Sequence, residues 1–207
     1  MIVWFQPTHT KSTLIHFYLY IMENKEREKQ SQSKEKPSFL YHGSPHKGIE
    51  EFEPRISKGM GKEFGAMVYA TPDLATASAF LAEVKKEWSA GRFGDTFYVI
   101  IPFPREEFIK DDKGGHIYVL PSDTFESDLK KGMGKYEWAS KTSVKPTKKI
   151  EYPSALNAML ENGVQVYFVG DNTYKQIKES TDHGFLILKN LESENQRRGI
   201  NVKSLTE

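Results

Sequence analysis

Three short segments carry side chains whose types suit polar chemistry. In "SFLYHGS" His42 and Gly43 follow an apolar run, "MVYAT" contains Tyr69, and "KYEWAS" contains Glu137. Histidine and tyrosine can bind a polar ligand, and a fixed carboxylate can stabilise positive charge that develops during a reaction. Each residue alone also has a structural explanation, as a polar residue at a turn, a core aromatic or an outward residue of an edge strand. Their combination is what suggests a site.

Other common chemistries are disfavoured by the sequence. The spacing of His42 and His46 would suit a metal site on a helix, but Gly43 and Pro45 lie between them and prevent that helix. We therefore predict no metal site. The chain contains no cysteine, which excludes disulfides, thiolate ligands and a cysteine nucleophile. The Gly-x-Ser-x-Gly elbow of serine hydrolases is also missing.

The order of the three segments adds a family resemblance. The stretches "YHGS" (41–44), "VYATPDLATASAFLA" (68–82) and "YEWASKTSVKP" (136–146) resemble the three signature elements of NAD-dependent ADP-ribosyltransferases of the His-Tyr-Glu class. This class includes diphtheria toxin and the poly(ADP-ribose) polymerases. The resemblance covers residues 38 to 153 and implies an α+β fold, in which split antiparallel β-sheets surround an NAD cleft with a few flanking helices.

The resemblance also implies a role for each residue. His42 would hydrogen-bond the adenosine ribose, and the backbone of Gly43 would hold the nicotinamide carboxamide. Tyr69 would stack on the nicotinamide, which is a cation in NAD and so gains a cation–π contribution. Glu137 would bind the nicotinamide ribose and stabilise the oxocarbenium-like transition state. Arg55 could reach the pyrophosphate from the first loop, and no metal is needed.

The function implied is cleavage of NAD and transfer of ADP-ribose to an acceptor or to water. The acceptor could be a protein side chain, a nucleic acid or a small molecule. Arginine-modifying relatives carry Gln or Glu two residues before the catalytic Glu, whereas this chain has Lys135 there, so arginine transfer is not supported. One alternative is a catalytically inert module on the same fold that binds a nucleotide or a partner. A weaker one is an NAD-dependent RNA 2′-phosphotransferase, whose spaced arginines are absent apart from Arg55.

Positioning these residues requires a strand-rich domain. Segments with β-branched and aromatic residues between turn formers predict strands at 39–43, 67–71, 96–103, 116–120, 136–140, 164–169 and 184–188. Helices are predicted over 154–162, which Gly163 would end, and over 172–180. Strands outnumber helices and the two do not alternate regularly, which favours an α+β fold.

A further helix is predicted immediately after Tyr69. Thr71 would cap it, Pro72 suits its first turn, and the apolar residues 74, 77, 81, 84 and 88 keep a helical period. Ala90 and Gly91 would mark its end. This helix would carry the middle segment of the resemblance.

Length and charge indicate the domain organisation and the kind of partner to expect. A chain of 207 residues fits a single domain, which we place at 38–207, and its net charge of +1 indicates no general affinity for nucleic acid. We expect residues 1–37 to be an extended or disordered leader, and we interpret 1–21 as an upstream extension of the reading frame. That apolar stretch is broken by charge and histidine and does not predict a membrane span. We expect a cytoplasmic enzyme, because the absence of cysteine fits a reducing compartment.

Overall fold

Nine strands form three small sheets in the part of the chain that the computed structural model describes, residues 36–56, 65–83, 88–127, 136–182 and 184–197. The first sheet has the order β1 (Phe39–Ser44), β6 (Gly115–Pro121), β8 (Lys148–Tyr152). The second has the order β2 (Arg55–Ile56), β3 (Ala66–Ala70), β7 (Trp138–Ser140). The third has the order β4 (Ser89–Phe93), β5 (Thr96–Ile101), β9 (Gln165–Phe168), and only its β5–β9 pair is parallel. The predicted α+β class is confirmed.

Five helices accompany these strands within the described residues. They are α2 (Leu74–Ala79), α3 (Arg105–Asp111), α4 (Ala155–Glu161), α5 (Asp171–Glu179) and α6 (Phe185–Arg197). All of them belong to the compact unit formed by residues 37–207. The predicted leader lies almost entirely outside the described residues.

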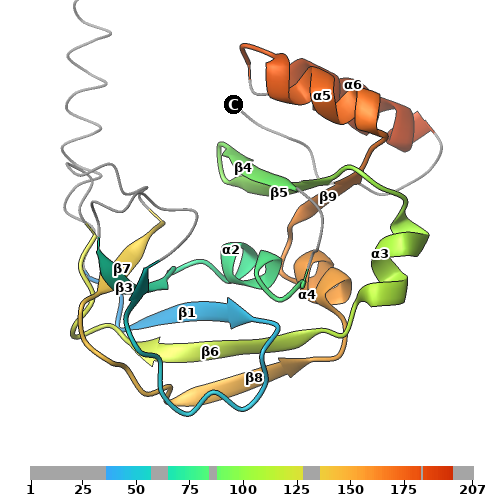
Figure 1. Ribbon diagram of the computed structural model, residues 1–207. Coiled ribbons are helices and arrows are strands. Elements are labelled where there is room, and N and C mark those ends of the chain that lie inside the picture. Colours follow the sequence, from blue (N-terminus) through green and yellow to red (C-terminus); the bar gives the residue numbers. More distant parts are fainter. Residues whose placement is uncertain (1–35, 57–64, 84–87, 128–135, 183, 198–207) are drawn as a thin grey trace, which may run out of the picture. The chain divides into compact units, whose positions relative to one another are not determined.

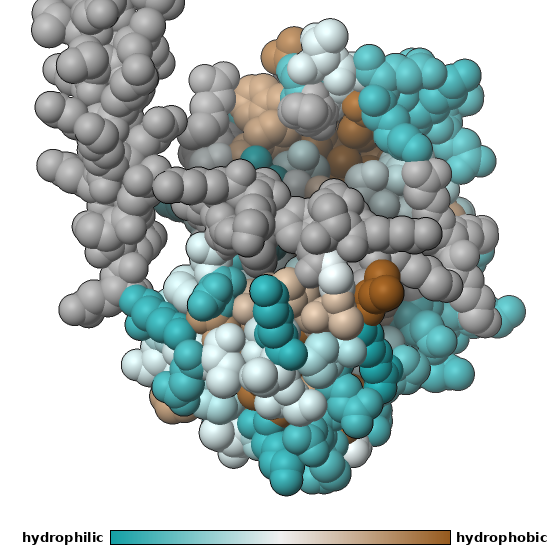
Figure 2. All heavy atoms as spheres, turned by 60° about the vertical axis from the view of Figure 1, so that its left-hand side comes forward, coloured by the Kyte–Doolittle hydropathy of each residue, from teal (hydrophilic) through white to brown (hydrophobic). Residues whose placement is uncertain are grey.

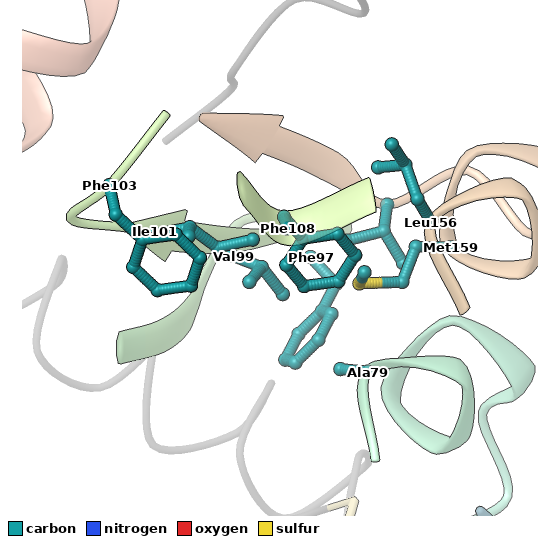
Figure 3. Packing of buried hydrophobic residues seen from close by; sticks show 9 residues of the cluster. Ala79, Phe97, Val99, Ile101, Phe103, Phe108, Leu156 and Met159 are labelled. Carbon is teal, nitrogen blue, oxygen red and sulfur yellow. The ribbon is translucent and has the colours of Figure 1, made fainter. Parts of the chain in front are cut away.

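Helices α2 and α4 pack against both the first and the third sheet (Figure 1). Ala77, Leu81 and Ala158 form a cluster with Ile117 of β6. Figure 3 shows the second cluster, where Ala79 of α2 and Met159 of α4 meet the apolar side chains of β5. The opposite face of β5 and β9 is covered by residues from α5 and α6. This burial of alanines keeps α2 close to β1, the strand that carries His42.

On the face drawn in Figure 2, hydrophilic residues make up much of the visible surface, and apolar residues gather in the upper part of the view next to atoms drawn in grey. Among the residues with described placement, six large apolar ones are exposed: Phe39, Ile56, Phe80, Ile109, Leu160 and Leu186. Single exposed apolar residues are normal in soluble domains. Of these, Phe80 lies beside the candidate site.

The helix predicted from Thr71 to residue 90 is much shorter than expected. Its cap is Asp73, whose carboxylate accepts hydrogen bonds from the backbone N–H and the hydroxyl of Thr76. The helix ends at Ala79. Residues 89–93 instead form β4, which a two-residue turn containing Gly94 at φ 54° joins to β5. A Gly-Asp pair between two strand-like runs is a hairpin signal that outweighs the helical period.

The strand predicted at 184–188 is also wrong, because Phe185 begins α6. The carboxylate of Asp182 accepts hydrogen bonds from the N–H groups of Gly184 and Leu186, so it satisfies donors that the first turn of a helix leaves open. A short apolar run does not distinguish a buried strand from a buried helix segment. The polar residues that follow the run continue the helix.

Candidate functional site

The first and second sheets meet at a single point and then separate. Tyr41 of β1 and Thr71, which follows β3, exchange two backbone hydrogen bonds of 2.7 and 2.9 Å. Within the described residues no further bridge continues this pairing toward Gly43 and Tyr69. The two strands therefore diverge beside the segments that the sequence singled out.

The side chain of His42 occupies the start of this divergence. Its Nδ1 lies 2.7 Å from the carbonyl oxygen of Tyr69, an atom that a continued ladder would have paired with Gly43. Because a carbonyl oxygen only accepts, Nδ1 carries the proton and donates it. The other ring nitrogen, Nε2, is then a hydrogen-bond acceptor as long as the ring is neutral.

The surroundings of His42 keep it neutral. Its ring packs against Phe52 with ring centroids 4.5 Å apart. Burial lowers the pKa of His42 below 6.5, although the hydrogen bond to Tyr69 acts in the opposite direction. The fold thus presents an acceptor nitrogen of fixed tautomer, which suits a hydroxyl donor such as that of a ribose.

Gly43 directs its backbone into the gap between the strands. In an antiparallel ladder, alternate residues point their N–H and C=O groups to opposite sides. Tyr41 uses the side that faces β3, so Gly43 faces the same side, beyond the point where β3 departs. A Cβ at Gly43 would lie 1.8 Å from the carbonyl oxygen of Ala77 in α2. Glycine is therefore required here by the close approach of the helix.

Tyr69 and Glu137 lie on one face of the second sheet. Tyr69 pairs with Ala139, and continuing this register places Glu137 opposite Thr71. Residues two apart on a strand share a face, so Glu137 lies diagonally across from Tyr69. Burial raises the pKa of Tyr69, and the nearby charge of Glu137 raises it further. The Glu137 carboxylate is therefore close enough to the Tyr69 hydroxyl to influence its ionisation.

The hydroxyl of Tyr69 is the second feature of this face. Its oxygen is buried and has no hydrogen-bond partner among the residues that the structure describes. A buried hydroxyl normally finds a partner, because leaving it without one costs free energy. The Tyr69 hydroxyl is thus available to a bound ligand or to a small movement of Glu137.

Phe80 is a site residue that sequence reasoning missed. It follows the last residue of α2, its side chain is 53 % exposed, and its Cβ lies 3.4 Å from the position of a Cβ at Gly43. An exposed ring beside the backbone of Gly43 can stack on a planar ligand. The signal was its place outside the apolar stripe predicted for the helix.

A cavity of about 460 Å³ opens on the His42 side of the divergence. His42, Phe52 and Tyr69 line it together with Arg55 and the carboxylates of Glu51 and Glu53. A cavity of this size is typical of small-molecule sites. Arg55 and His42 therefore line the same cavity.

Tyr118 fixes the loop that forms one wall of this cavity. Its side chain is fully buried, and its hydroxyl accepts from the N–H of Ile49 at 3.1 Å and donates to the carbonyl of His46 at 2.9 Å. The Phe52 ring packs on its edge at 5.1 Å. The wall is therefore built from the fully buried face of β6.

The structure brings the five predicted site residues together in two groups. His42, Tyr69 and Arg55 line the cavity, whereas Gly43 and Glu137 do not. Glu137 shares a face of the second sheet with Tyr69, and the hydrogen bond from His42 to the Tyr69 carbonyl connects the two groups. The candidate site consequently consists of the cavity and the adjoining face of the second sheet, which share Tyr69.

Two kinds of feature are absent from the described residues. No group of three or more histidine and carboxylate side chains in this part of the chain could hold a metal ion. No helix there has the length and apolar character needed to cross a membrane.

Comparison with known proteins supplies no relative. The chain matches no family model, no curated protein and no solved structure.

Proposed function

We propose that this protein is an NAD-dependent ADP-ribosyltransferase of the His-Tyr-Glu class, with that family's split-sheet fold. The observation that carries the proposal is the gap between β1 and β3. There a neutral His42 donates a hydrogen bond to the Tyr69 carbonyl, the N–H and C=O of Gly43 face the gap, and Tyr69 and Glu137 share one face of the neighbouring sheet. The His42 side of the gap suits the adenosine half of a dinucleotide, and the Gly43 side suits the nicotinamide half.

The adenosine half is assigned to the cavity. Nε2 of His42 would accept a hydrogen bond from the adenosine ribose, and Arg55 would contact the pyrophosphate. Phe52 supplies an apolar wall. This assignment leaves the opposite end of the dinucleotide directed into the gap.

The nicotinamide half is assigned to Gly43 and its surroundings. The N–H and C=O of Gly43 complement a primary amide, and Tyr69 and Phe80 offer aromatic faces to the pyridinium ring. Glu137 would bind the ribose hydroxyl. When the bond between ribose and nicotinamide breaks, nicotinamide leaves with the electron pair, and the carboxylate stabilises the positive charge left on the sugar.

Nicotinamide release tests the proposal directly. The purified chain is incubated with NAD, and free nicotinamide and ADP-ribose are quantified with and without a mixture of protein and RNA. We expect nicotinamide release, with ADP-ribose recovered either free or attached to an acceptor. NAD binding without release would favour the inert module, and the absence of both would overturn the proposal.

The pH dependence of binding follows from the tautomer of His42. Because the pKa of His42 is lowered below 6.5, NAD affinity should stay constant from pH 8 to 6.5. At lower pH protonation of Nε2 removes the acceptor, and affinity should fall roughly tenfold. The folded state should also lose stability below pH 6.5, because the unfolded chain takes up this proton first.

Calorimetric titration with NAD between pH 8 and 5 measures this dependence. His116 of β6, changed to Asn, serves as the control because it is a histidine that does not line the cavity. A decline that begins well above pH 6.5, or the same profile in His42→Gln, would contradict the assigned role.

A further inference from the structure

Arg92 of β4 connects three segments that meet next to Glu137. Its side chain is only 16 % exposed. The guanidinium pairs with the carboxylate of Asp73, the cap of α2, and donates to the Thr76 hydroxyl at 3.0 Å. Its other terminal nitrogen donates to the carbonyl of Asp95 at 3.0 Å, within the turn that joins β4 to β5.

The same guanidinium lies over the ring of Tyr136. The guanidinium carbon is 4.0 Å from the centroid of this ring and 5.1 Å from that of Phe97. Contacts of this kind contribute about 0.5–2 kcal/mol, more when the groups are withdrawn from water. Tyr136 immediately precedes Glu137, so a contact that holds its ring also restrains the carboxylate's backbone.

The ion pair with Asp73 fixes the position of the Arg92 guanidinium. Burial alone would raise the pKa of Asp73, but hydrogen bonds from Thr76 and the charge of Arg92 together lower it below its ordinary value. The pair is therefore fully charged at neutral pH. Asp73 lies two residues after Thr71, which pairs with β1 at the point of divergence, so the ion pair ties Tyr136 to this point.

We propose that Arg92 is a positioning residue, which sets the place of Glu137 in the gap by clamping Tyr136 against the first turn of α2. It does not contact the substrate itself. The inference rests on the proposed function, because its catalytic consequence requires Glu137 to act on NAD. It adds a residue from the third sheet, which otherwise takes no part in the site.

The geometry requires arginine and not only a positive charge. A planar guanidinium can stack on Tyr136 while its edge binds Asp73 and Thr76. A lysine ammonium is a point charge and cannot make the stacked contact and the forked hydrogen bonds at once. Arg92→Lys therefore keeps the positive charge but loses the stacked contact with Tyr136.

The test measures kcat and KM for nicotinamide release in Arg92→Lys and Arg92→Met. We expect kcat to fall roughly 10- to 100-fold in both, because a displacement of about 1 Å at the reacting group has effects of this size. KM for NAD should change less than about threefold, since the binding groups are elsewhere. Arg105→Lys and Arg105→Met, at the exposed start of α3, are the matched controls and should keep both values.

A double-mutant cycle distinguishes positioning from general destabilisation. If Arg92 acts through Glu137, Arg92→Lys should lower the rate little or not at all in a Glu137→Gln background. Equal losses in both backgrounds, or an unchanged kcat in Arg92→Lys with active wild type, would overturn the inference. An inactive wild type would overturn the proposed function instead.

Hydrogen exchange gives a readout that does not depend on catalysis. We expect the amides of residues 136–138 to lose protection in Arg92→Met at a temperature where the variant is folded, while those of β6 stay protected. Unchanged protection at 136–138 would contradict the clamp, whatever the activity of the chain.

Discussion

Replacing Glu137 by glutamine should nearly abolish nicotinamide release while leaving NAD binding almost intact. The amide keeps the size and a hydrogen-bonding oxygen of the side chain but carries no negative charge. Removing one preorganised group that stabilises transition-state charge typically costs 10²- to 10³-fold in rate, about 3–4 kcal/mol. We therefore expect kcat to fall by roughly 10²- to 10³-fold, with KM for NAD within about threefold of wild type.

Single-turnover release of nicotinamide measures this effect, and calorimetry measures NAD binding separately. Glu161→Gln is the matched control, because Glu161 is an exposed carboxylate at the end of α4. A Glu137→Gln variant that binds NAD and releases nicotinamide at the wild-type rate would remove Glu137 from the catalytic role. The His42 and Gly43 assignments would then concern binding only.

Much of the fold could be predicted from local sequence. The alternation and β-branched content of 39–43, 67–71 and 116–120 correspond to β1, β3 and β6, and the helices predicted at 154–162 and 172–180 correspond to α4 and α5. The pairing of these elements was not predictable. β1 lies beside β6, more than 70 residues later in the chain, because their apolar faces share one core, and such long-range pairing leaves no local signal.

In the candidate site, too, some features could be predicted from the sequence and others could not. His42, Tyr69 and Glu137 could be proposed from the order of three short segments. The hydrogen bond from His42 to the Tyr69 carbonyl spans 27 residues and depends on where β3 leaves β1, which no residue pattern specifies. Arg92 was hidden by a wrong prediction, because it belongs to β4, which begins where the helix was expected to end.

Replacing Gly43 by alanine should disrupt the gap more than any other small substitution there. The added Cβ would lie 1.8 Å from the Ala77 carbonyl oxygen and 2.8 Å from its carbon, both backbone atoms that cannot rotate away. Helix α2 must therefore move away from β1. Overpacking of this kind costs about 3 kcal/mol, and at roughly 2–4 °C per kcal/mol the Tm should fall by about 6–12 °C.

The same movement should weaken NAD binding by roughly 10- to 100-fold even where the variant is folded. Phe80 follows the last residue of α2, so it would shift together with the helix relative to the Gly43 backbone groups. Gly170→Ala is the matched control, because a Cβ at Gly170 meets no atom within 4 Å and its φ of −75° suits alanine. Ile177→Ala, at a buried position of α5, supplies a destabilised variant whose NAD affinity should stay unchanged. If Gly43→Ala instead kept the wild-type Tm and NAD affinity, α2 would not constrain β1 and the nicotinamide assignment at Gly43 would fail.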